Sequence, residues 1–420
     1  MDNNIEKHIE EICIKANKAS KSLSHASSKS KNQALQLITK HIKKDKNDIL
    51  KANSIDIKSA RENNVSEALL DRLLLNESRI NDMIKGLDNI ILLNDPIGSE
   101  IKKWTPKNGI IMSQTRVPIG VIGIIYESRP NVTADASALA LKSGNAIILR
   151  GGSESFHSSS AIVKSIKNGL KESDISENCI QMVNTISRDA VGALLNMSKY
   201  INLIIPRGGK ALIERVQIDS KIAVLSHLDG LCHTYIDKDA NLKMAKKILI
   251  NAKLRNTSIC GATETLLIHK NKSKNVNEIL NELTERGCYI YADRKISKLF
   301  NGNSKLANNK TWSKEHLSAK ISVKLVNNIN DAVNHINKYG TMHTDAIITN
   351  NKISAKFFIK NIKSSIAIHN SSTQYADGGE FGFGGEVGIS TNKLPPRGPV
   401  GLNQLVSYKY EIYGSGQTRK

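Results

Sequence analysis

Hydrophobic residues recur every three or four positions through the first hundred residues of the chain. The positions with this spacing are Ile5, Ile9, Ile12 and Ala16, then Leu35, Ile38 and Ile42, and later Leu69, Leu73 and Leu74. A period near 3.6 residues is that of an α-helix with one apolar face. Charged residues fill the opposite faces, so we expect an amphipathic helical layer that packs on a sheet formed later in the chain.

A different pattern begins at Gly120, where short apolar runs alternate with helical stretches. The expected strands are 120–126, 145–150, 180–183, 201–205 and 222–225, and the expected helices include 134–141 and 158–170. This strand–helix rhythm predicts a doubly wound parallel sheet. Turn residues follow the strands, and open α/β sheets bind ligands beyond the carboxyl ends of their strands. We therefore expect binding sites at that edge.

A second alternation of strands and helices runs from 240 to 368. Its expected strands are 265–268, 321–325, 345–349 and 365–368. The pattern predicts a second α/β domain, again with turn residues at the carboxyl ends of its strands. Two stretches lie outside both alternations, namely 110–112 and the tail, where apolar residues alternate from Leu405 to Tyr410. We expect these stretches to pair as strands in an oligomerisation flap.

Length and composition then narrow the class of protein. A chain of 420 residues with 40% hydrophobic content has room for two or three domains. No apolar run approaches the ~18 residues of a membrane helix, and the first residues lack the features of a secretory signal. The five cysteines are scattered without Cys-x-x-Cys spacing, which argues against a disulfide framework and a zinc site. We expect a cytoplasmic protein with no membrane segment and no bound metal.

The formal net charge of +21 raises the question of nucleic-acid binding. The lysines, however, are dispersed along the whole chain and mixed with acidic residues and asparagines. There is no recognition-helix pattern and no aromatic ladder on which bases would stack. We therefore expect no nucleic-acid partner, although a positive surface would steer small anions toward a cleft.

One stretch carries a candidate nucleophile. A helical pattern ends near Ala252, small polar residues follow, and Cys260 stands beside Gly261 just before the expected strand 265–268. A thiolate that attacks an electrophilic carbon needs such a loop, with an approach path and backbone N–H groups nearby. A free cysteine is also often a small buried hydrophobe. The spacing alone does not decide between these interpretations.

Three loops in the first alternation have chemical content. In the loop 126–133, Arg129 can pair with an anion, and Asn131 can cap the next helix or present its amide to a developing oxyanion. On these residues alone, capping is the favoured interpretation. The other two loops are glycine turns that lead from a strand into a helix. They contain Arg150, Gly151, Gly152 and Ser153 in one, and Arg207, Gly208, Gly209 and Lys210 in the other.

Neither glycine turn has the Walker A or Gly-x-Gly-x-x-Gly pattern, and either one alone is a weak signal. Two such turns in one sheet, each with cations, favour phosphate binding, because glycine lets backbone N–H groups approach a ligand closely. A further stretch, 377–389, has six glycines in thirteen residues. Its interleaved Phe381, Phe383, Val387 and Ile389 indicate an irregular but packed loop.

Together these pieces resemble the gamma-glutamyl phosphate reductase family of the aldehyde dehydrogenase superfamily, over nearly the whole chain. The specific motifs are Tyr126-Glu-Ser-Arg-Pro-Asn-Val-Thr133, Leu141-Lys-Ser-Gly-Asn-Ala146, Ile205-Pro-Arg-Gly-Gly-Lys210, His227-Leu-Asp-Gly-Leu-Cys-His-Thr-Tyr235, Ile259-Cys260 with Glu264-Thr-Leu266, His343-Thr-Asp-Ala-Ile347 and Phe381-Gly-Phe-Gly384.

The resemblance implies that NADPH reduces L-glutamyl 5-phosphate to L-glutamate 5-semialdehyde with release of phosphate, the second step of proline synthesis. It implies that Cys260 is the nucleophile, which forms a thioester, and that Asn131 is the oxyanion donor. It places Arg150 near the cofactor ribose and the Gly208–Gly209 turn at the pyrophosphate. It also implies that Glu315 anchors the nicotinamide ribose.

The resemblance bears on two further positions. His227 stands where hydrolytic aldehyde dehydrogenases carry a glutamate base that activates water. The absence of that base is consistent with a reductase, whose intermediate must not hydrolyse. The sequence leaves open whether His227 contacts the substrate or only packs. Arg129 is the other candidate for substrate contact. The family often has Pro-Gly-Val before the nucleophile, whereas this chain has Asn256-Thr257-Ser258-Ile259, which leaves the rigidity of the loop open.

The implied domain organisation follows the superfamily. An NADPH-binding domain comprises 1–108 and 121–229, and a catalytic domain comprises 230–369. Oligomerisation segments are 109–120 and 395–420, and the glycine-rich return segment 370–394 packs at the cofactor domain. We expect a homodimer or a higher homo-oligomer, with transient contact to a glutamate 5-kinase that hands over the labile substrate. The alternative is an NAD(P)-dependent aldehyde dehydrogenase that oxidises a small aldehyde.

Overall fold

The structure is a computed structural model that describes residues 3–419, and the chain divides into two compact units. The first unit comprises the chain up to Ser226, the segment Gly382–Gly388 and the chain from Val400 onward. The second comprises His227–Phe381 and Ile389–Pro399. Within the described part of the chain, no helix has the length and apolar character that crossing a membrane requires.

The first unit begins with five helices, as the apolar spacing predicts. They are α1 (Asn3–Leu23), α2 (Ser28–Lys44), α3 (Lys46–Glu62), α4 (Glu67–Leu73) and α5 (Glu77–Leu92). Two of them start at side-chain caps, because Ser27 accepts a hydrogen bond from the Ser30 backbone and Asn76 accepts one from the Arg79 backbone. Their apolar faces, such as that of Ile9 and Ile12 on α1, are buried.

These helices pack on a parallel four-stranded sheet with the order β5-β4-β3-β6. Its strands are β3 (Val121–Tyr126), β4 (Ala146–Gly151), β5 (Ile180–Met182) and β6 (Leu203–Arg207), and its helices are α6 (Asn131–Lys142), α7 (Phe156–Lys171), α8 (Asp189–Leu195) and α9 (Lys210–Asp219). Alternate residues of β3 enter different cores, with Ile122 and Ile124 on one face and Val121 and Ile125 on the other. Both faces are therefore covered, which confirms the doubly wound sheet.

The segment 222–225 is not a strand, which corrects one sequence prediction. It makes a single bridge, between Val224 and Ile204 of β6. The backbone of Ile204 and those of Ala223 and Leu225 exchange hydrogen bonds there, and no further ladder forms. The apolar run lies beside β6, but it pairs for too short a distance to form a strand.

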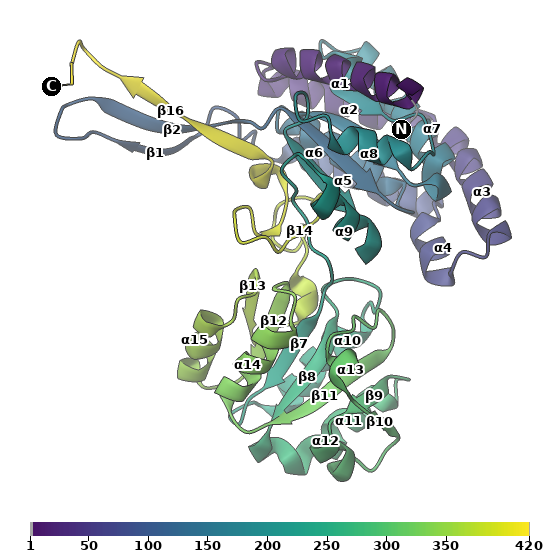
Figure 1. Cartoon of the computed structure of the whole chain (residues 1–420), viewed down its shortest axis with the longest axis vertical. Helices are drawn as coiled ribbons and strands as arrows, with labels where there is room; N and C mark the ends of the chain where they lie inside the picture. Colours follow the sequence, from purple (N-terminus) through teal and green to yellow (C-terminus); the bar gives the residue numbers. More distant parts are fainter. Residues whose placement is uncertain (1–2, 420) are drawn as a thin grey trace. The chain divides into compact units, whose positions relative to one another are not determined.

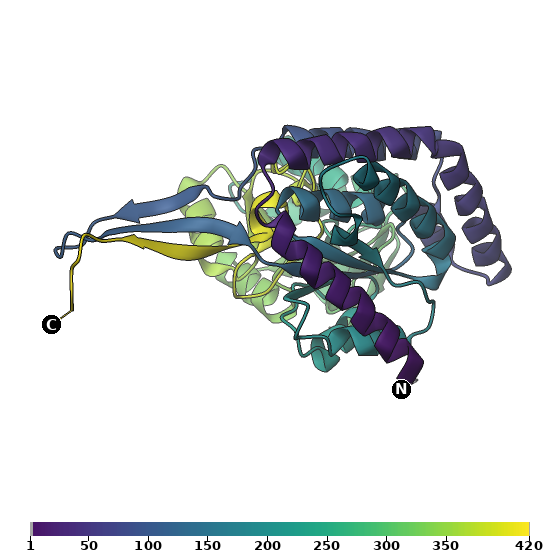
Figure 2. The same ribbon diagram turned by 90° about the horizontal axis from the view of Figure 1, so that it is seen from above.

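A three-stranded antiparallel sheet completes the first unit. Its strands are β1 (Glu100–Trp104), β2 (Ile111–Pro118) and β16 (Val406–Tyr413), and β2 lies in the middle. Figures 1 and 2 show this arm extending away from the four-stranded sheet of the same unit. The predicted pairing of the 110–118 region with the tail is confirmed. Strand β1 was not predicted, because its sequence, Glu-Ile-Lys-Lys-Trp, is mostly exposed and polar.

The second unit has a parallel seven-stranded sheet with the order β10-β9-β11-β8-β7-β12-β13. The strands are β7 (Cys232–Ile236), β8 (Thr263–His269), β9 (Tyr289–Ala292), β10 (Ser304–Leu306), β11 (Lys320–Val326), β12 (Thr344–Ile348) and β13 (Ile366–His369), and a separate pair is β14 (Ile389–Ser390) with β15 (Gly398–Pro399). Its helices are α10 (Leu242–Leu254), α11 (Val276–Thr284), α12 (Arg294–Leu299), α13 (Asn309–Trp312), α14 (Ile329–Tyr339) and α15 (Lys352–Asn361). The four predicted strands are present, and β7, β9 and β10 are additional.

Candidate active site

Cys260 lies on a short turn that separates α10 from β8, as the sequence predicts. Its side chain is partly exposed, whereas the other four cysteines are buried. Gln374 fixes this turn from the far end of the chain: its amide donates to the carbonyls of Ala252 at 2.9 Å and Asn256 at 3.1 Å. Its Oε1 accepts from Arg255 Nε at 2.8 Å. The loop that lacks the family's Pro-Gly pair is therefore held by side-chain hydrogen bonds.

Gly230 lies directly against the backbone of Cys260. A Cβ at position 230 would stand 2.1 Å from the Cys260 carbonyl oxygen and 2.6 Å from its Cα, so only glycine fits. Glu315 holds this glycine in place, because its Oε1 accepts a hydrogen bond from the Gly230 N–H at 2.9 Å. The buried Cys232 thiol lies on the same carbonyl, with Sγ 3.1 Å from the Cys260 oxygen. The backbone of Cys260 is thus tightly enclosed, while its side chain remains partly accessible.

Two imidazoles flank the Cys260 thiol. The donor atoms of Cys260, His227 and His343 all lie within 4.8 Å of one another. His227 Nδ1 donates to the Ile389 carbonyl at 2.8 Å, which leaves Nε2 for the thiol side. His343 follows Met342, whose φ of +60° is in the strained left-handed region. Strain of this kind persists where the surrounding structure fixes the backbone.

The two histidines determine the acidity of the Cys260 thiol. Burial alone would raise its pKa, but the electrostatic interaction with His343 and a hydrogen bond with His227 lower it by more, and the resulting pKa is well below the ordinary 9.0. At Cys13, Cys179 and Cys288 the effect of burial prevails, and it raises the pKa of each thiol to about 12. Cys260 is therefore the thiolate-forming cysteine of the chain.

This difference predicts selective alkylation. Iodoacetamide should label one thiol per native chain at pH 7, at Cys260, since only a thiolate reacts and the lowered pKa gives Cys260 a larger thiolate fraction than the buried cysteines with raised pKa values. The rate should rise with pH around a midpoint well below 9.0. In His343→Gln the midpoint should move up toward 9.0, and the thiolate fraction at pH 7 falls about tenfold for every pH unit by which the midpoint rises above 7. His369→Gln, a substitution elsewhere in the same unit, is the control, and an unmoved midpoint in His343→Gln contradicts the assignment.

The reactive side chains of the second unit lie at an unexpected edge of its sheet. Cys260 precedes β8, His343 precedes β12 and His227 precedes β7, and these three strands are parallel neighbours. All three residues are thus at the amino ends of strands. Ligand sites were expected at the carboxyl ends of these strands, whereas Cys260 comes from the turn that enters a strand rather than the turn that leaves one.

A buried ion pair connects the nucleophile turn with the loop that carries Glu315. Lys253 Nζ, at the end of α10, lies 2.9 Å from Glu264 Oε2 on β8, and both side chains are at most 1% exposed. The Glu264 carboxylate also accepts from the backbone N–H groups of His316 and Leu317, next to Glu315. Burial raises the pKa of Glu264 to about 7, although Lys253 opposes the shift. This network positions both walls of the Cys260 site.

Removing one partner of this pair should destabilise the protein strongly. Lys253→Met leaves a buried carboxylate without its cation, a change that costs about 3–5 kcal/mol in comparable sites. The effect should appear in urea unfolding at pH 8, above the pKa of Glu264, where the carboxylate is ionised. Lys246→Met, which breaks the solvent-exposed pair with Glu278 on the neighbouring helix, is the matched control and should change stability far less. Equal losses in the two variants would show that burial of the pair is not what matters.

In the first unit, the predicted cofactor residues lie at the carboxyl ends of β4 and β6. The turn after β6 presents the Gly209 N–H at the start of α9, and the Glu127 carboxylate occupies it, with Oε2 at 2.8 Å. A Cβ at Gly208 would stand 2.4 Å from the same oxygen. The Glu127 carboxylate therefore occupies the N–H group at which a phosphate oxygen was expected.

The second turn is organised by Arg150, which is buried. Its guanidinium donates to the carbonyls of Gly151 at 2.9 Å, Ile186 at 3.2 Å and Ser187 at 3.2 Å. The side chain thus ties β4 to the loop that precedes α8. Ser153 opens the short helix that follows the turn.

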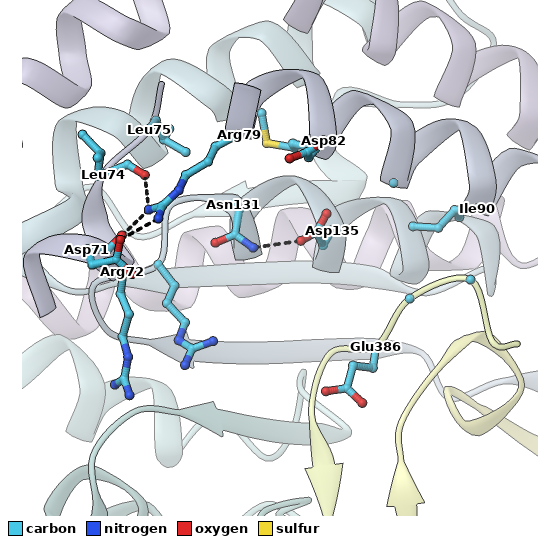
Figure 3. A pocket seen from close by; sticks show the side chains of 15 residues that line it. Asp71, Arg72, Leu74, Leu75, Arg79, Asp82, Ile90, Asn131, Asp135 and Glu386 are labelled. Carbon is cyan, nitrogen blue, oxygen red and sulfur yellow. Dashed lines mark hydrogen bonds and ion pairs between the residues drawn. The ribbon is translucent and has the colours of Figure 1, made fainter. Parts of the chain in front are cut away.

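Asn131 and Arg129 line a cavity of about 460 Å³ in the first unit. The other charged residues of its wall are Asp71, Arg72, Arg79, Asp82, Asp135 and Glu386. Figure 3 shows Glu386 across the cavity from the Asn131–Asp135 pair. Arg79 binds the C-terminal part of α4, since it donates to the Leu74 carbonyl at 3.0 Å and pairs with Asp71 at 2.6 Å. The cavity therefore combines cationic and anionic groups around an amide.

The capping interpretation of Asn131 is wrong. Pro130 occupies the N-cap position, and Asn131 is the first residue of α6. Its amide Nδ2 donates to Asp135 Oδ2 at 3.1 Å, one helical turn further on, instead of accepting from the helix backbone. Burial raises the pKa of Asp135 to about 6, although the Asn131 hydrogen bond opposes this. The Asn131 amide is therefore oriented by a side chain and lines the cavity.

The structure thus brings Cys260, His227 and Glu315 together in the second unit. In the first unit it groups Asn131 with Arg129, and the two glycine turns with Arg150, Lys210 and Arg207. Sequence reasoning did not assign roles to His343, Cys232 and Gln374. For His343 a signal existed, because His343-Thr-Asp-Ala-Ile347 was already a motif before a predicted strand. For Gln374 the sequence offers none, since its contact is with a turn far away along the chain.

Comparison with known proteins gives consistent results. The aldehyde dehydrogenase family profile matches residues 2–287. The gamma-glutamyl phosphate reductase of Bartonella tribocorum is 48% identical over 406 residues, which are 96% of this chain and 99% of that protein. The enzyme of the same name from Paramagnetospirillum magneticum is 47% identical over 96% of both chains. The crystal structure of the gamma-glutamyl phosphate reductase from Thermotoga maritima is 40% identical, has a TM-score of 0.95, and matches 98% of this chain and all of its own.

Proposed function

Because the chain belongs to the aldehyde dehydrogenase family and to its gamma-glutamyl phosphate reductases, we propose that it reduces L-glutamyl 5-phosphate to L-glutamate 5-semialdehyde with NADPH and releases phosphate. This is the second step of proline biosynthesis from glutamate. The observation that carries the proposal is the Cys260 thiol, which is partly exposed and has a lowered pKa.

The chain's own residues perform the acyl transfer. The Cys260 thiolate attacks the acyl carbon of the mixed anhydride, the carbon–oxygen bond to phosphate breaks, and a thioester forms on Sγ. Asn131 and the Cys260 backbone N–H stabilise the oxyanion of this step. An acyl phosphate has a good leaving group, so the thiolate alone is sufficient to attack it. Reduction then breaks the carbon–sulfur bond and returns the thiolate.

The residues of the first unit fit a nicotinamide dinucleotide. The Gly209 N–H already donates to an anionic oxygen, and Arg207 and Lys210 flank the same turn, which favours a phosphorylated nucleotide. Gly208 and Gly209 would contact the pyrophosphate, while Arg150, Gly151 and Ser153 would line the ribose side. Glu315 would orient the nicotinamide ribose. When bound, NADPH supplies the hydride.

We assign the cavity beside Asn131 to the amino-acid end of the substrate. Glutamyl phosphate carries an α-carboxylate and an α-ammonium group, and the wall offers Arg72 and Arg129 for the first and Asp135 and Glu386 for the second. Charge-assisted hydrogen bonds of this kind bind a zwitterion tightly. His227, on the thiol side, would contact the reacting end.

Arg129→Gln tests this assignment. The loss of one charge-assisted hydrogen bond should raise the KM for glutamate semialdehyde about tenfold or more, with a much smaller change in kcat. Butyraldehyde, which lacks the amino-acid end, should be insensitive to the same substitution. An unchanged KM for the semialdehyde, or an equal rise for butyraldehyde, would remove the cavity from substrate binding.

The reverse reaction tests the function as a whole. Glutamate semialdehyde with NADP⁺ should give NADPH only when inorganic phosphate is present, because phosphate must take the acyl group from Cys260. NAD⁺ should support a slower rate. Steady oxidation of the semialdehyde or of simple aldehydes without phosphate would instead favour the hydrolytic aldehyde dehydrogenase.

We also propose that the three-stranded arm joins protomers in a homodimer or higher oligomer. The arm's last strand, β16, exposes Tyr408, Tyr410 and Ile412, an apolar surface that a monomer rarely leaves open. A chain that ends at Leu405 should be monomeric by light scattering while the full chain is not; equal masses would contradict the proposal.

Hand-over of the substrate from a glutamate 5-kinase stays a prediction. Undiminished coupled flux with the two enzymes on opposite sides of a membrane permeable to small molecules would contradict it.

A further inference from the structure

Cys260, His227 and His343 are three metal-ligand donors that converge from distant parts of the second unit. One sulfur and two ring nitrogens lie within 4.8 Å of one another. Tetrahedral Zn²⁺ takes thiolate sulfur at about 2.3 Å and imidazole nitrogen at about 2.0–2.1 Å, which places neighbouring ligand atoms roughly 3.3–3.6 Å apart. The observed donor atoms, none more than 4.8 Å from another, would need to approach to these separations when a metal ion binds.

Both imidazoles are oriented as metal ligands usually are. A ligating histidine uses its second nitrogen in an outer hydrogen bond, which fixes the tautomer and the ring direction. His227 Nδ1 donates to the Ile389 carbonyl at 2.8 Å, so its Nε2 presents the lone pair. His343 Nδ1 lies 2.9 Å from Thr344 Oγ1. The nitrogen left for a metal ion is therefore Nε2 in each ring.

A separate observation points to a ligand at this position. His343 is fully buried, and among the described residues its Nε2 makes no hydrogen bond of ordinary length and angle, although the ring interacts with the neighbouring Cys260 thiol. A buried polar atom without a partner costs free energy, and such atoms are rare unless the site serves a function. A cation that the Cys260 sulfur and the His227 ring share would give this nitrogen the partner it lacks.

We propose that Cys260, His227 and His343 bind a thiophilic divalent cation, Zn²⁺ above all, and that the bound ion reversibly inhibits the enzyme. A thiolate with two imidazoles is a donor set that Zn²⁺ accepts readily. The sulfur lone pair that attacks the substrate is then donated to the metal, so the nucleophile is lost while the ion is bound. The fourth position stays open to water. The binding does not depend on the proposed reaction, whereas the inhibition rests on it.

The absence of metal-binding spacing in the sequence is consistent with this site. Zinc motifs are recognised when two ligands lie a few residues apart. Here each ligand comes from a different turn, ahead of β7, β8 and β12, and only the parallel pairing of these strands unites them. We expected no zinc site because the cysteines lack Cys-x-x-Cys spacing. That criterion does not detect ligands that only the folded chain brings together.

Cobalt spectroscopy tests the site without an activity assay. The metal-free full chain, titrated with Co²⁺, should take up one equivalent with thiolate-to-cobalt charge-transfer and tetrahedral d–d bands, and Zn²⁺ should abolish both. Cys260→Ser should lose the charge-transfer band. His343→Ala should weaken binding by more than the ~10–100-fold that follows loss of an outer-sphere partner. Cys288→Ser, a buried cysteine of the same unit's core, should behave as wild type.

Two outcomes would overturn the site. One is a charge-transfer band that persists in Cys260→Ser and disappears in Cys232→Ser, which would move the sulfur ligand. The other is cobalt uptake without that band, or with unchanged affinity in both His343→Ala and His227→Gln, which would mean adventitious binding at surface histidines. Melting curves by circular dichroism show which variants are folded.

The inhibition has its own test. One equivalent of Zn²⁺ should stop the phosphate-dependent reaction and EDTA should restore it. A chain that gives the cobalt bands but no reductase activity would keep the site and refute the function.

Discussion

Cys260→Ala should abolish formation of glutamate semialdehyde, with a loss of turnover of about 10⁴-fold or more, while NADPH binding remains. The size follows from the mechanism, since covalent capture has no substitute once the sulfur is gone. No other cysteine can replace it, because Cys232 is buried and burial raises its pKa well above the ordinary value. Rapid-mixing assays of turnover and fluorescence titration with NADPH measure the two quantities separately.

Cys288→Ala provides the matched control, as a cysteine removed from the core of the same unit. It should lower stability modestly and leave turnover near wild type. Cys260→Ser should be almost as inactive as Cys260→Ala, because a serine hydroxyl is not ionised by the neighbouring imidazoles near neutral pH. Wild-type turnover in either Cys260 variant would remove the thioester from the mechanism.

Asn131→Ala should reduce the rate about 10²–10³-fold, which is the effect of losing one oxyanion donor. The structure supports a chemical role because Asn131 does not cap α6 and because Asp135 orients its amide toward the cavity. The loss should appear in kcat more than in KM, since the oxyanion develops only as the acyl carbon reacts. Single-turnover kinetics with glutamyl phosphate measure this step.

Asn131→Asp is the isosteric control, because it keeps the shape and removes the donors. It should be at least as slow as Asn131→Ala while its melting temperature shows whether the first unit stays intact. If both variants lose activity only in proportion to a lowered melting temperature, Asn131 is structural and the oxyanion must be stabilised by another group.

Local patterns in the sequence were sufficient for the two parallel sheets in outline and for the helical layer. The period of 3.6 identified the first hundred residues as helical, and short runs of Ile, Leu and Val identified β3, β4 and β8, because strands buried on both faces are almost wholly apolar. The same rule missed β1 and β10, whose residues are polar and exposed. It also made 222–225 a strand, since apolar character does not reveal whether a partner strand continues beside it.

The site was less accessible to sequence reasoning than the fold. Motifs named Cys260 and Asn131, but capping rules misassigned Asn131, because Pro130 had already taken the cap position. The location of Cys260 at the amino ends of strands, the clamp from Gln374 and the pairing of His343 with the thiol all depend on strand order. Strand order is a tertiary property, and spacing along one chain does not encode it.

The most direct test of the thioester account is mass spectrometry of the peptide that contains Cys260. The full chain is incubated with glutamate semialdehyde and NADP⁺ without phosphate, quenched in acid and digested. The account predicts one glutamyl group on Cys260 and one NADPH per chain, and both the adduct and the halt in NADPH formation should disappear when phosphate is added. Continued NADPH formation with an unmodified Cys260, or a glutamyl adduct on another residue, would contradict it.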